Sequence, residues 1–414
     1  MASFWLASPK WLQGDCSSNM STLHPTLSLA SISPNGGNLS LASAYGVDIS
    51  IMRIDQLAAE LLLHVFRSCD SVADVLNLSV ICRRLHRVLN STSKLHILAR
   101  AAETEFGPLE DIIQVLTQNE SQPAHIIRHA PISDPLLKQV IQLGVVARKW
   151  ETIYPFKKWK IDFENRRSLT NDERLRLRRA VYRLWLYHRA FHSSVYDRHS
   201  RCLRHVVLER AQLLHNWSTQ ELAEIEDLRL VMGDIVQNYI CPSNGTIQRK
   251  FRKRYPDSSQ QLSFNIHLNY PSPSTTSLSS HDHSLFQMGP EASIQQYFHT
   301  AHSRNYAESP AKFRSRFRND LSHDPGYEGW GDEIPHYYIM QDMLKLDPGQ
   351  ILWLRDHALL KEQVEEFVWS LGEWFRNNGE TFGDTLDYVM NERGLEVGEF
   401  RSAVAGRDMG IVLD

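Results

Sequence analysis

Residues 57–85 read Leu-Ala-Ala-Glu-Leu-Leu-Leu-His-Val-Phe-Arg-Ser-Cys-Asp-Ser-Val-Ala-Asp-Val-Leu-Asn-Leu-Ser-Val-Ile-Cys-Arg-Arg-Leu. Apolar residues recur here at spacings of three and four, which is the periodicity of one helix face. Ser71 and Asp74 suit the start of a second helix, because the hydroxyl can accept a backbone N–H and the carboxylate lies near the positive helix end. The segment therefore predicts two or three short amphipathic helices.

Such a unit is too small to fold alone. About 40 residues fall below the size that usually supports an independent core. The segment also has more apolar residues than one interior could bury, and exposed apolar faces at that density usually mark a partner interface. Burying four or five such side chains would contribute roughly 1.5–3 kcal/mol each before entropy costs. The segment is either the first part of a larger helical domain, which periodicity alone favours, or a docking element.

The order of residues in this segment resembles an F-box, through which substrate receptors dock on a Skp–cullin ubiquitin ligase. The family pattern begins with Leu-Pro-x-Glu and two hydrophobic residues, and it ends with Leu-x-x-Val-Cys-Arg-Arg. Ala58 stands where most F-boxes carry proline. The residues that match at family spacing are Leu57, Glu60, Leu61, Leu62, Val65, Phe66, Asp74, Val75, Leu78, Cys82, Arg83, Arg84 and Leu85.

The resemblance implies a mainly α-helical protein with a trihelical F-box at residues 52–95. It implies a substrate-recognition subunit that binds a Skp-type adaptor and, through it, a cullin. An unidentified protein substrate would bind the C-terminal helical region, and the chain would carry no catalytic activity of its own. The residues expected to bind the adaptor are Leu57, Ala58, Leu61, Leu62, Val65, Phe66, Val75, Leu78, Cys82, Arg83 and Leu85.

The rest of the chain predicts further helices, which we expect to form a receptor domain over residues 96–414. Thr170 and Ser218 each precede a glutamate by three residues, as in a capping box, and Asp134-Pro135 and Asp347-Pro348 each fit a helix cap followed by a first-turn proline. No internal repeat of a solenoid or propeller is present. Two segments, 179–187 and 350–357, more loosely resemble filamentous-fungal F-box proteins with a long helical C-terminal region.

Two segments interrupt the helical pattern. Residues 1–51 have poor periodicity and few charges, which predicts a disordered tail. A Ser/Pro-rich run at 270–280 predicts a loop near 241–290. The basic run 249–254 falls in that region. It indicates either a nuclear-import patch or acidic-partner contact, or simply a solvated loop, which we favour.

Composition narrows the functional classes. The chain has 414 residues, 45 basic and 48 acidic, with a net charge of −3, which argues against a dedicated nucleic-acid or membrane-surface protein. Five cysteines, odd in number and far apart, argue against a disulfide framework. No secretory signal or long apolar run is evident, so no membrane partner and a cytoplasmic or nuclear location are expected.

The sequence gives weaker support to a metal site or a catalytic site. His188 and His192 lie four residues apart, with His199 downstream, a spacing that can place two imidazoles on one helix face. His281-Asp282-His283 lies in the predicted loop. No phosphate-binding, dinucleotide-binding or serine-nucleophile motif occurs. We therefore predict no catalytic residue, metal ligand or cofactor.

Three alternatives to the ubiquitin-ligase hypothesis stay open. An unrecognised hydrolase would need an ordered pocket with a nucleophile and a base brought together from distant parts of the sequence. The remaining two alternatives are binding proteins. One is an F-box scaffold that binds the adaptor without a role in ubiquitylation. The other is a helical nucleic-acid-binding regulator, although the near-neutral net charge counts against it. Its candidate contacts are Arg174, Arg176, Arg178, Arg179 and Arg183.

Overall fold

A computed structural model describes residues 54–91, 93–196, 203–257, 340, 342–372, 374–375 and 380–413. These residues belong to one compact unit, Arg53–Asp414. All the regular secondary structure of the described residues is helical, which confirms the mainly α fold class. The predicted tail at 1–51, the Ser/Pro-rich run and the histidines at 199, 281 and 283 lie outside the described residues.

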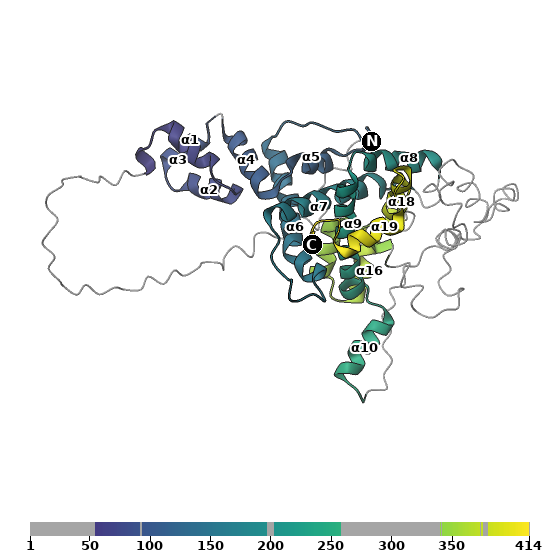
Figure 1. The fold of residues 1–414 in the computed structure, drawn as a ribbon. Coiled ribbons are helices and arrows are strands. Elements are labelled where there is room, and N and C mark those ends of the chain that lie inside the picture. The colour runs from purple at the N-terminus through teal and green to yellow at the C-terminus, as the bar shows by residue number, and fades with distance from the viewer. Residues whose placement is uncertain are drawn as a thin grey trace. The chain divides into compact units, whose positions relative to one another are not determined.

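The described part begins with a short 3-10 turn, η2 (Ile54–Gln56), and three short helices (Figure 1, purple). These are α1 (Ala59–Arg67), α2 (Val72–Val80) and α3 (Arg83–Leu89), and α3 packs against both of the others. Ser71 caps α2 as predicted, since its hydroxyl accepts the N–H of Asp74 at 3.0 Å. The buried side chains of this cluster include Leu62, Phe66, Val75, Leu85 and Leu89.

Helix α4 (Lys94–Phe106) joins the three short helices to the rest of the unit. It packs against α1 and α2, and also against α6 (Asp134–Lys158). A Cβ at Gly144 of α6 would lie 2.4 Å from the ring of Phe106. Glycine therefore permits the close approach of α4 and α6, because real Cβ contacts are never that short.

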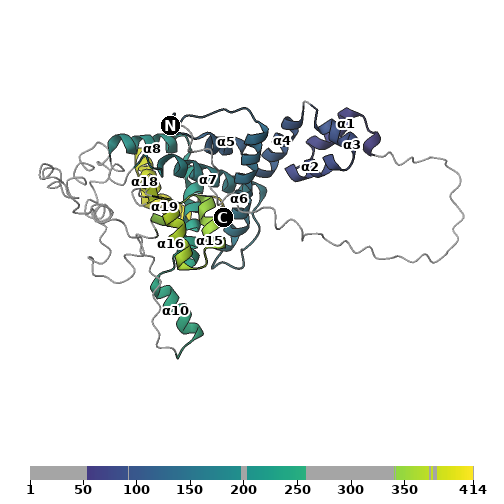
Figure 2. The ribbon, with the colours of Figure 1, turned by 180° about the vertical axis from the view of Figure 1, so that it is seen from behind.

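Helix α7 (Asn171–Phe191) lies at the centre of the larger part. It packs against α5 (Leu109–Thr117), α6 and α9 (Thr219–Ile235), as the two opposite views show (Figures 1 and 2). Its core contacts are rich in aromatic side chains, and Trp150 and Tyr154 from α6 and Tyr182 and Tyr187 from α7 are all fully buried. The predicted capping boxes at Thr170 and Ser218 begin α7 and α9.

The remaining helices, apart from α10, complete the larger part. They are α8 (Arg204–His215), the π-helix η4 (Val236–Ile240), α15 (Pro348–His357), α16 (Lys361–Ser370), α18 (Phe382–Glu392) and α19 (Val397–Gly406). Helix α15 packs on α6, α7 and α9, while α18 packs on α8 and α19 on α9. None of the helices among the described residues is long and apolar enough to cross a membrane.

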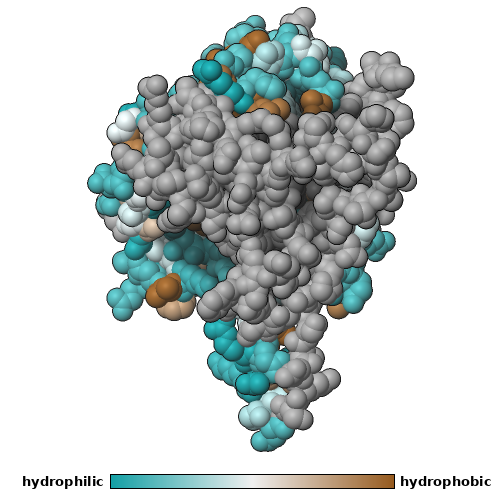
Figure 3. All heavy atoms as spheres, turned by 90° about the vertical axis from the view of Figure 1, so that its right-hand side faces the viewer, coloured by the Kyte–Doolittle hydropathy of each residue, from teal (hydrophilic) through white to brown (hydrophobic). Residues whose placement is uncertain are grey.

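Two local predictions need correction. Ser133, and not Asp134, caps α6, with its hydroxyl accepting the N–H of Leu136. Part of the segment predicted as a loop near 241–290 is helical, since residues Asn244–Arg254 form α10. This helix is the protrusion at the foot of Figure 3, and its coloured surface there is mostly hydrophilic.

Candidate docking surface

Helices α1 and α2 carry large apolar side chains on their outer faces. On α1, Leu61 is 51% exposed and Val65 is half-buried. On α2, Leu76 is exposed and Val80 is 76% exposed. Residues four apart lie on one helix face, so each helix presents an apolar row. We call these two pairs, together with Leu57 before α1 and Ile81 after α2, the docking rows.

The predicted adaptor-binding residues divide into two groups. Leu62, Phe66, Val75 and Leu85 are fully buried within the chain, where they hold the three short helices together. The others lie at the surface or partly so: Leu57, Ala58, Leu61, Val65, Leu78, Cys82 and Arg83. The buried group supports the exposed group from behind, so only the exposed group is placed to contact another protein.

The end of the motif shapes the backbone between α2 and α3. Cys82 is the N-cap of α3, and its sulfur accepts the N–H of Leu85 at 3.5 Å. Arg84 donates from Nη2 to the carbonyl of Leu57 at 2.7 Å. This bond ties the start of the motif to its end, so Leu57 is fixed close to α3. Cys82 and Arg84 therefore have structural roles here.

Four exposed apolar residues were missed by reasoning from the motif. These are Ile54, Leu76, Val80 and Ile81, of which Ile81 is 68% exposed. A signal was present in the sequence, because α2 has apolar residues on more than one face and a short helix cannot bury two faces against a single neighbour. The F-box pattern does not include these four positions, so a search for the pattern does not select them.

Glu105 of α4 connects the short helices to the larger part. Its carboxylate accepts the N–H of Val72, at the start of α2, at 2.9 Å and pairs with Arg148 of α6 at 2.5 Å. The backbone next to it is also bound, since Tyr182 donates to the carbonyl of Phe106 at 2.8 Å. The docking rows are thus held at a fixed position relative to α6 and α7.

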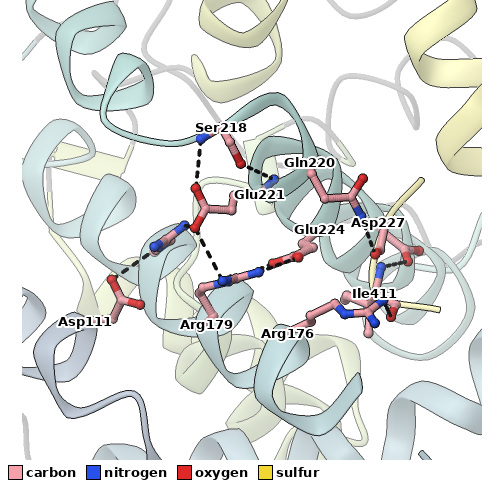
Figure 4. A network of polar contacts seen from close by, with 11 residues as sticks. Asp111, Arg176, Arg179, Ser218, Gln220, Glu221, Glu224, Asp227 and Ile411 are labelled. Carbon is pink, nitrogen blue, oxygen red and sulfur yellow. Dashed lines mark hydrogen bonds and ion pairs between the residues drawn. The ribbon is translucent and has the colours of Figure 1, made fainter. Parts of the chain in front are cut away.

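Four of the five candidate arginines of α7 form contacts within the protein, and Figure 4 shows the contacts of Arg176 and Arg179. Arg179 donates to Glu224 at 2.6 and 2.9 Å, and Arg183 lies 2.8 Å from Glu221 and 3.2 Å from Asp111. Burial raises the pKa of Glu224, whereas the neighbouring Arg179 acts in the opposite direction. The ion pairs join α5, α7 and α9.

Two further arginines of this helix also form contacts within the protein. Arg178 lies 2.8 Å from Glu151 of α6, and Arg176 donates to the carbonyl of Ile411 at 3.1 Å. A guanidinium that is held against an internal carboxylate or carbonyl has fewer N–H donors left for a phosphate backbone. These contacts count against α7 as a nucleic-acid-binding helix.

The histidine pair of α7 is buried. The rings of His188 and His192 lie 4.8 Å apart, and burial lowers the pKa of His188 to about 3. Burial likewise lowers the pKa of His192, whose Nδ1 lies 3.0 Å from the carbonyl oxygen of Lys345. Among the described residues, no group of three or more His, Cys, Asp or Glu side chains is placed to hold a metal ion.

Comparison of the chain with models of protein families, with curated proteins and with solved structures found no significant match. The F-box stays a prediction from the residues of the motif. The geometry of the docking rows is independent of that prediction.

Proposed function

We propose that this protein is the substrate-recognition subunit of a Skp–cullin–F-box ubiquitin ligase. In this proposal residues 54–91 dock on the Skp-type adaptor, and the helices from α5 onward hold a protein target. The protein carries out no chemistry of its own, since it acts by bringing the target close to the ubiquitin-charged enzyme.

The proposal rests on one observation, which is that α1 and α2 carry two sets of apolar residues. One set, which includes Leu62 and Phe66, fills the interior of the short helices, while a second set, which includes Leu61 and Val80, faces outward. Exposed apolar residues at this density mark an interface. The ordered match to the F-box pattern identifies the adaptor as the partner that best fits this surface.

The link through α4 supports a receptor role. A ligase must hold its target at a defined distance from the adaptor, which requires a rigid connection between the two binding parts. Glu105 and the close contact of Phe106 with Gly144 provide such a connection.

Co-purification with a Skp-type adaptor tests the proposal. We expect the full chain to form a stable complex with the adaptor and to recruit a cullin. The double variant Leu61→Asp/Val65→Asp should lose the complex, because two charges would be buried without partners at the interface. Leu359→Asp places one such charge on a side chain that is 81% exposed outside the docking rows, and should leave the complex intact.

The outcomes separate the alternatives. Absence of any complex with the adaptor would overturn the proposal. A complex that contains the adaptor but never a cullin would favour the scaffold without a role in ubiquitylation. A complex that the Leu61→Asp/Val65→Asp variant also forms would show that the adaptor binds elsewhere.

A further inference from the structure

A second group of exposed apolar side chains lies far from the docking rows in the sequence. It is carried by the end of α6 and by the loop that follows, residues 159–170. Phe156 is 61% exposed, Phe163 is 68% exposed and Ile161 is 90% exposed. Three large apolar side chains left in water within eight residues are unusual for a surface that has no partner.

The chain holds this loop in place. The guanidinium carbon of Arg166 lies 4.7 Å from the ring centre of Phe163 and 5.4 Å from that of Phe156. Arg166 also donates to the carbonyl of Trp159 at 3.2 Å, and Asp162 pairs with Arg407 at 3.2 Å. A surface that is already ordered loses little entropy when it binds a partner.

Helix α10 adds a strong positive charge. Five of its eleven residues are basic, and none is acidic. Helix α10 has no extensive packing against any other helix of the described residues. The cations begin six residues beyond the N-cap Ser243, so they extend roughly 9–17 Å along the helix axis from that cap. They are Arg249, Lys250, Arg252, Lys253 and Arg254.

Tyr239 of η4 lies against the end of α6, a few residues before α10 begins. Lys157, next to Phe156, has its Nζ 4.0 Å from the ring centre of Tyr239 and 2.6 Å from Asp234. Lys160 pairs with the same carboxylate at 2.9 Å, so two lysines more than neutralise it. Because α10 starts only a few residues after Tyr239, the apolar loop and the basic helix belong to one end of the receptor part.

The aromatic rings argue against single-stranded nucleic acid as the ligand. Base stacking uses ring faces, and one face of each ring is already taken, since Arg166 lies over Phe156 and Phe163 and Lys157 lies over Tyr239. The most exposed apolar residue, Ile161, is aliphatic. This chemistry suits apolar side chains better than bases.

The sequence of the loop argues against a membrane. Ile161 and Phe163 alternate with Asp162 and Glu164. Inserting the apolar residues into a bilayer would take these carboxylates out of water, which is unfavourable.

We propose that the loop after α6 and helix α10 together bind an acidic peptide segment. One or two large apolar side chains of the peptide contact Phe156, Ile161 and Phe163, and its carboxylates pair with the cations of α10. The role of this peptide as the target of a ligase rests on the proposed function. The binding of the peptide does not, because it uses neither the docking rows nor the adaptor.

A phage-displayed library of random peptides, selected on the purified full chain, tests this proposal. We expect the selected peptides to be rich in Asp and Glu around Leu, Ile or Phe. The binding of a fluorescein-labelled peptide of the selected sequence should weaken at least tenfold in Ile161→Ser/Phe163→Ser and in Arg252→Glu/Lys253→Glu. Leu359→Ser, an equally exposed change elsewhere, should bind like the wild type.

Several results would overturn the proposal. These are a selection without enrichment, selected peptides without an acidic excess, and peptide binding by both double variants that equals binding by the wild type. Displacement of the peptide by oligouridine or by phosphatidylserine vesicles, with the same variants defective, would assign the surface to those ligands instead.

Measuring adaptor binding with the same protein preparations distinguishes the two proposals. A chain that binds the adaptor but selects no acidic peptide contradicts only the peptide site. A chain that selects acidic peptides but binds no adaptor contradicts the ligase function and leaves the peptide site in place.

Discussion

At the scale of single residues, Ala58 departs from the F-box pattern without departing from its geometry. It is the N-cap of α1, with φ −58° and ψ 151°. Proline fixes φ near −65°, so the backbone already has the conformation that proline would adopt. The absence of proline therefore increases the conformational freedom of the unfolded chain and changes the folded backbone little.

We expect Ala58→Pro to stabilise the protein by about 0.4–1 kcal/mol, because proline restricts the unfolded chain at a position where the native φ suits it. Urea denaturation of the two proteins measures this difference. The adaptor complex should be at least as stable as that of the wild type. A lower urea midpoint for the variant would contradict this reading of the α1 start.

Gly144 offers a second test at this scale. The Cβ of Gly144→Ala would meet the ring of Phe106, so we expect a loss of about 1–3 kcal/mol from overpacking. Gly233 in α9 is the matched control, since a Cβ there meets nothing within 4 Å. Gly233→Ala should stabilise by roughly 0.5–1 kcal/mol. Equal effects at both positions, measured by thermal unfolding, would contradict the close contact of α4 and α6.

At the scale of helices, the buried pair on α7 makes stability depend on pH. The folded protein holds His188 neutral, since its pKa is lowered to about 3, whereas the unfolded chain binds a proton near pH 6.5. This contribution is fully present above pH 6.5 and is lost as the pH falls toward 3. The positive side chains of Arg229, Lys345 and Arg210 lower the pKa values of the pair in the same direction.

From His188 alone we expect the free energy of unfolding to fall by about 2 kcal/mol between pH 7.5 and pH 5, at about 1.4 kcal/mol per unit below its unfolded pKa. His192 adds to this loss in the same direction. Urea denaturation at the two pH values measures the total. His188→Leu should reduce the difference, and a variant whose stability fell as steeply as that of the wild type would contradict the assignment.

Some helix features could be predicted because they are local. The caps at Ser71, Thr170, Ser218 and Asp347 depend on residues three positions apart, and the structure has all four. Helix α10 was missed, since five cations in eleven residues resemble a solvated loop when composition alone is considered.

The division of the apolar residues between core and surface could not be predicted. In α1, Leu61 and Leu62 are adjacent and equally apolar, yet the first is exposed and the second is buried. Which one turns inward depends on where α3 and α4 lie, and these positions are set by contacts distant in the sequence. For the same reason, the sequence could not predict the burial of His188 or the ion pair between Arg179 and Glu224.

At the scale of the whole molecule, the connection between the short helices and the larger part is the feature on which a ligase role depends. We expect Glu105→Ala to loosen this connection, because the N–H of Val72 and the guanidinium of Arg148 would both lose their partner. A loss of roughly 1–3 kcal/mol would follow.

Amide hydrogen exchange locates this effect. Exchange should become faster at the start of α2 and along α4 in Glu105→Ala, while α7 and α9 keep their protection. Glu110→Ala, a change of the same type at an exposed residue of α5, should leave the exchange unaltered. Uniformly faster exchange would mean that Glu105 stabilises the fold generally without acting as a specific connection.

The affinity of the full chain for a Skp-type adaptor, measured by titration calorimetry, tests the central claim most directly. We predict binding with a negative heat-capacity change, because apolar surface is buried. The double variant Leu61→Asp/Val80→Asp should weaken the affinity by about 100-fold or more, equivalent to roughly 2.7 kcal/mol, and Leu359→Asp should not. No binding by the wild type, or equal binding by Leu61→Asp/Val80→Asp, would contradict the claim that the docking rows bind the adaptor.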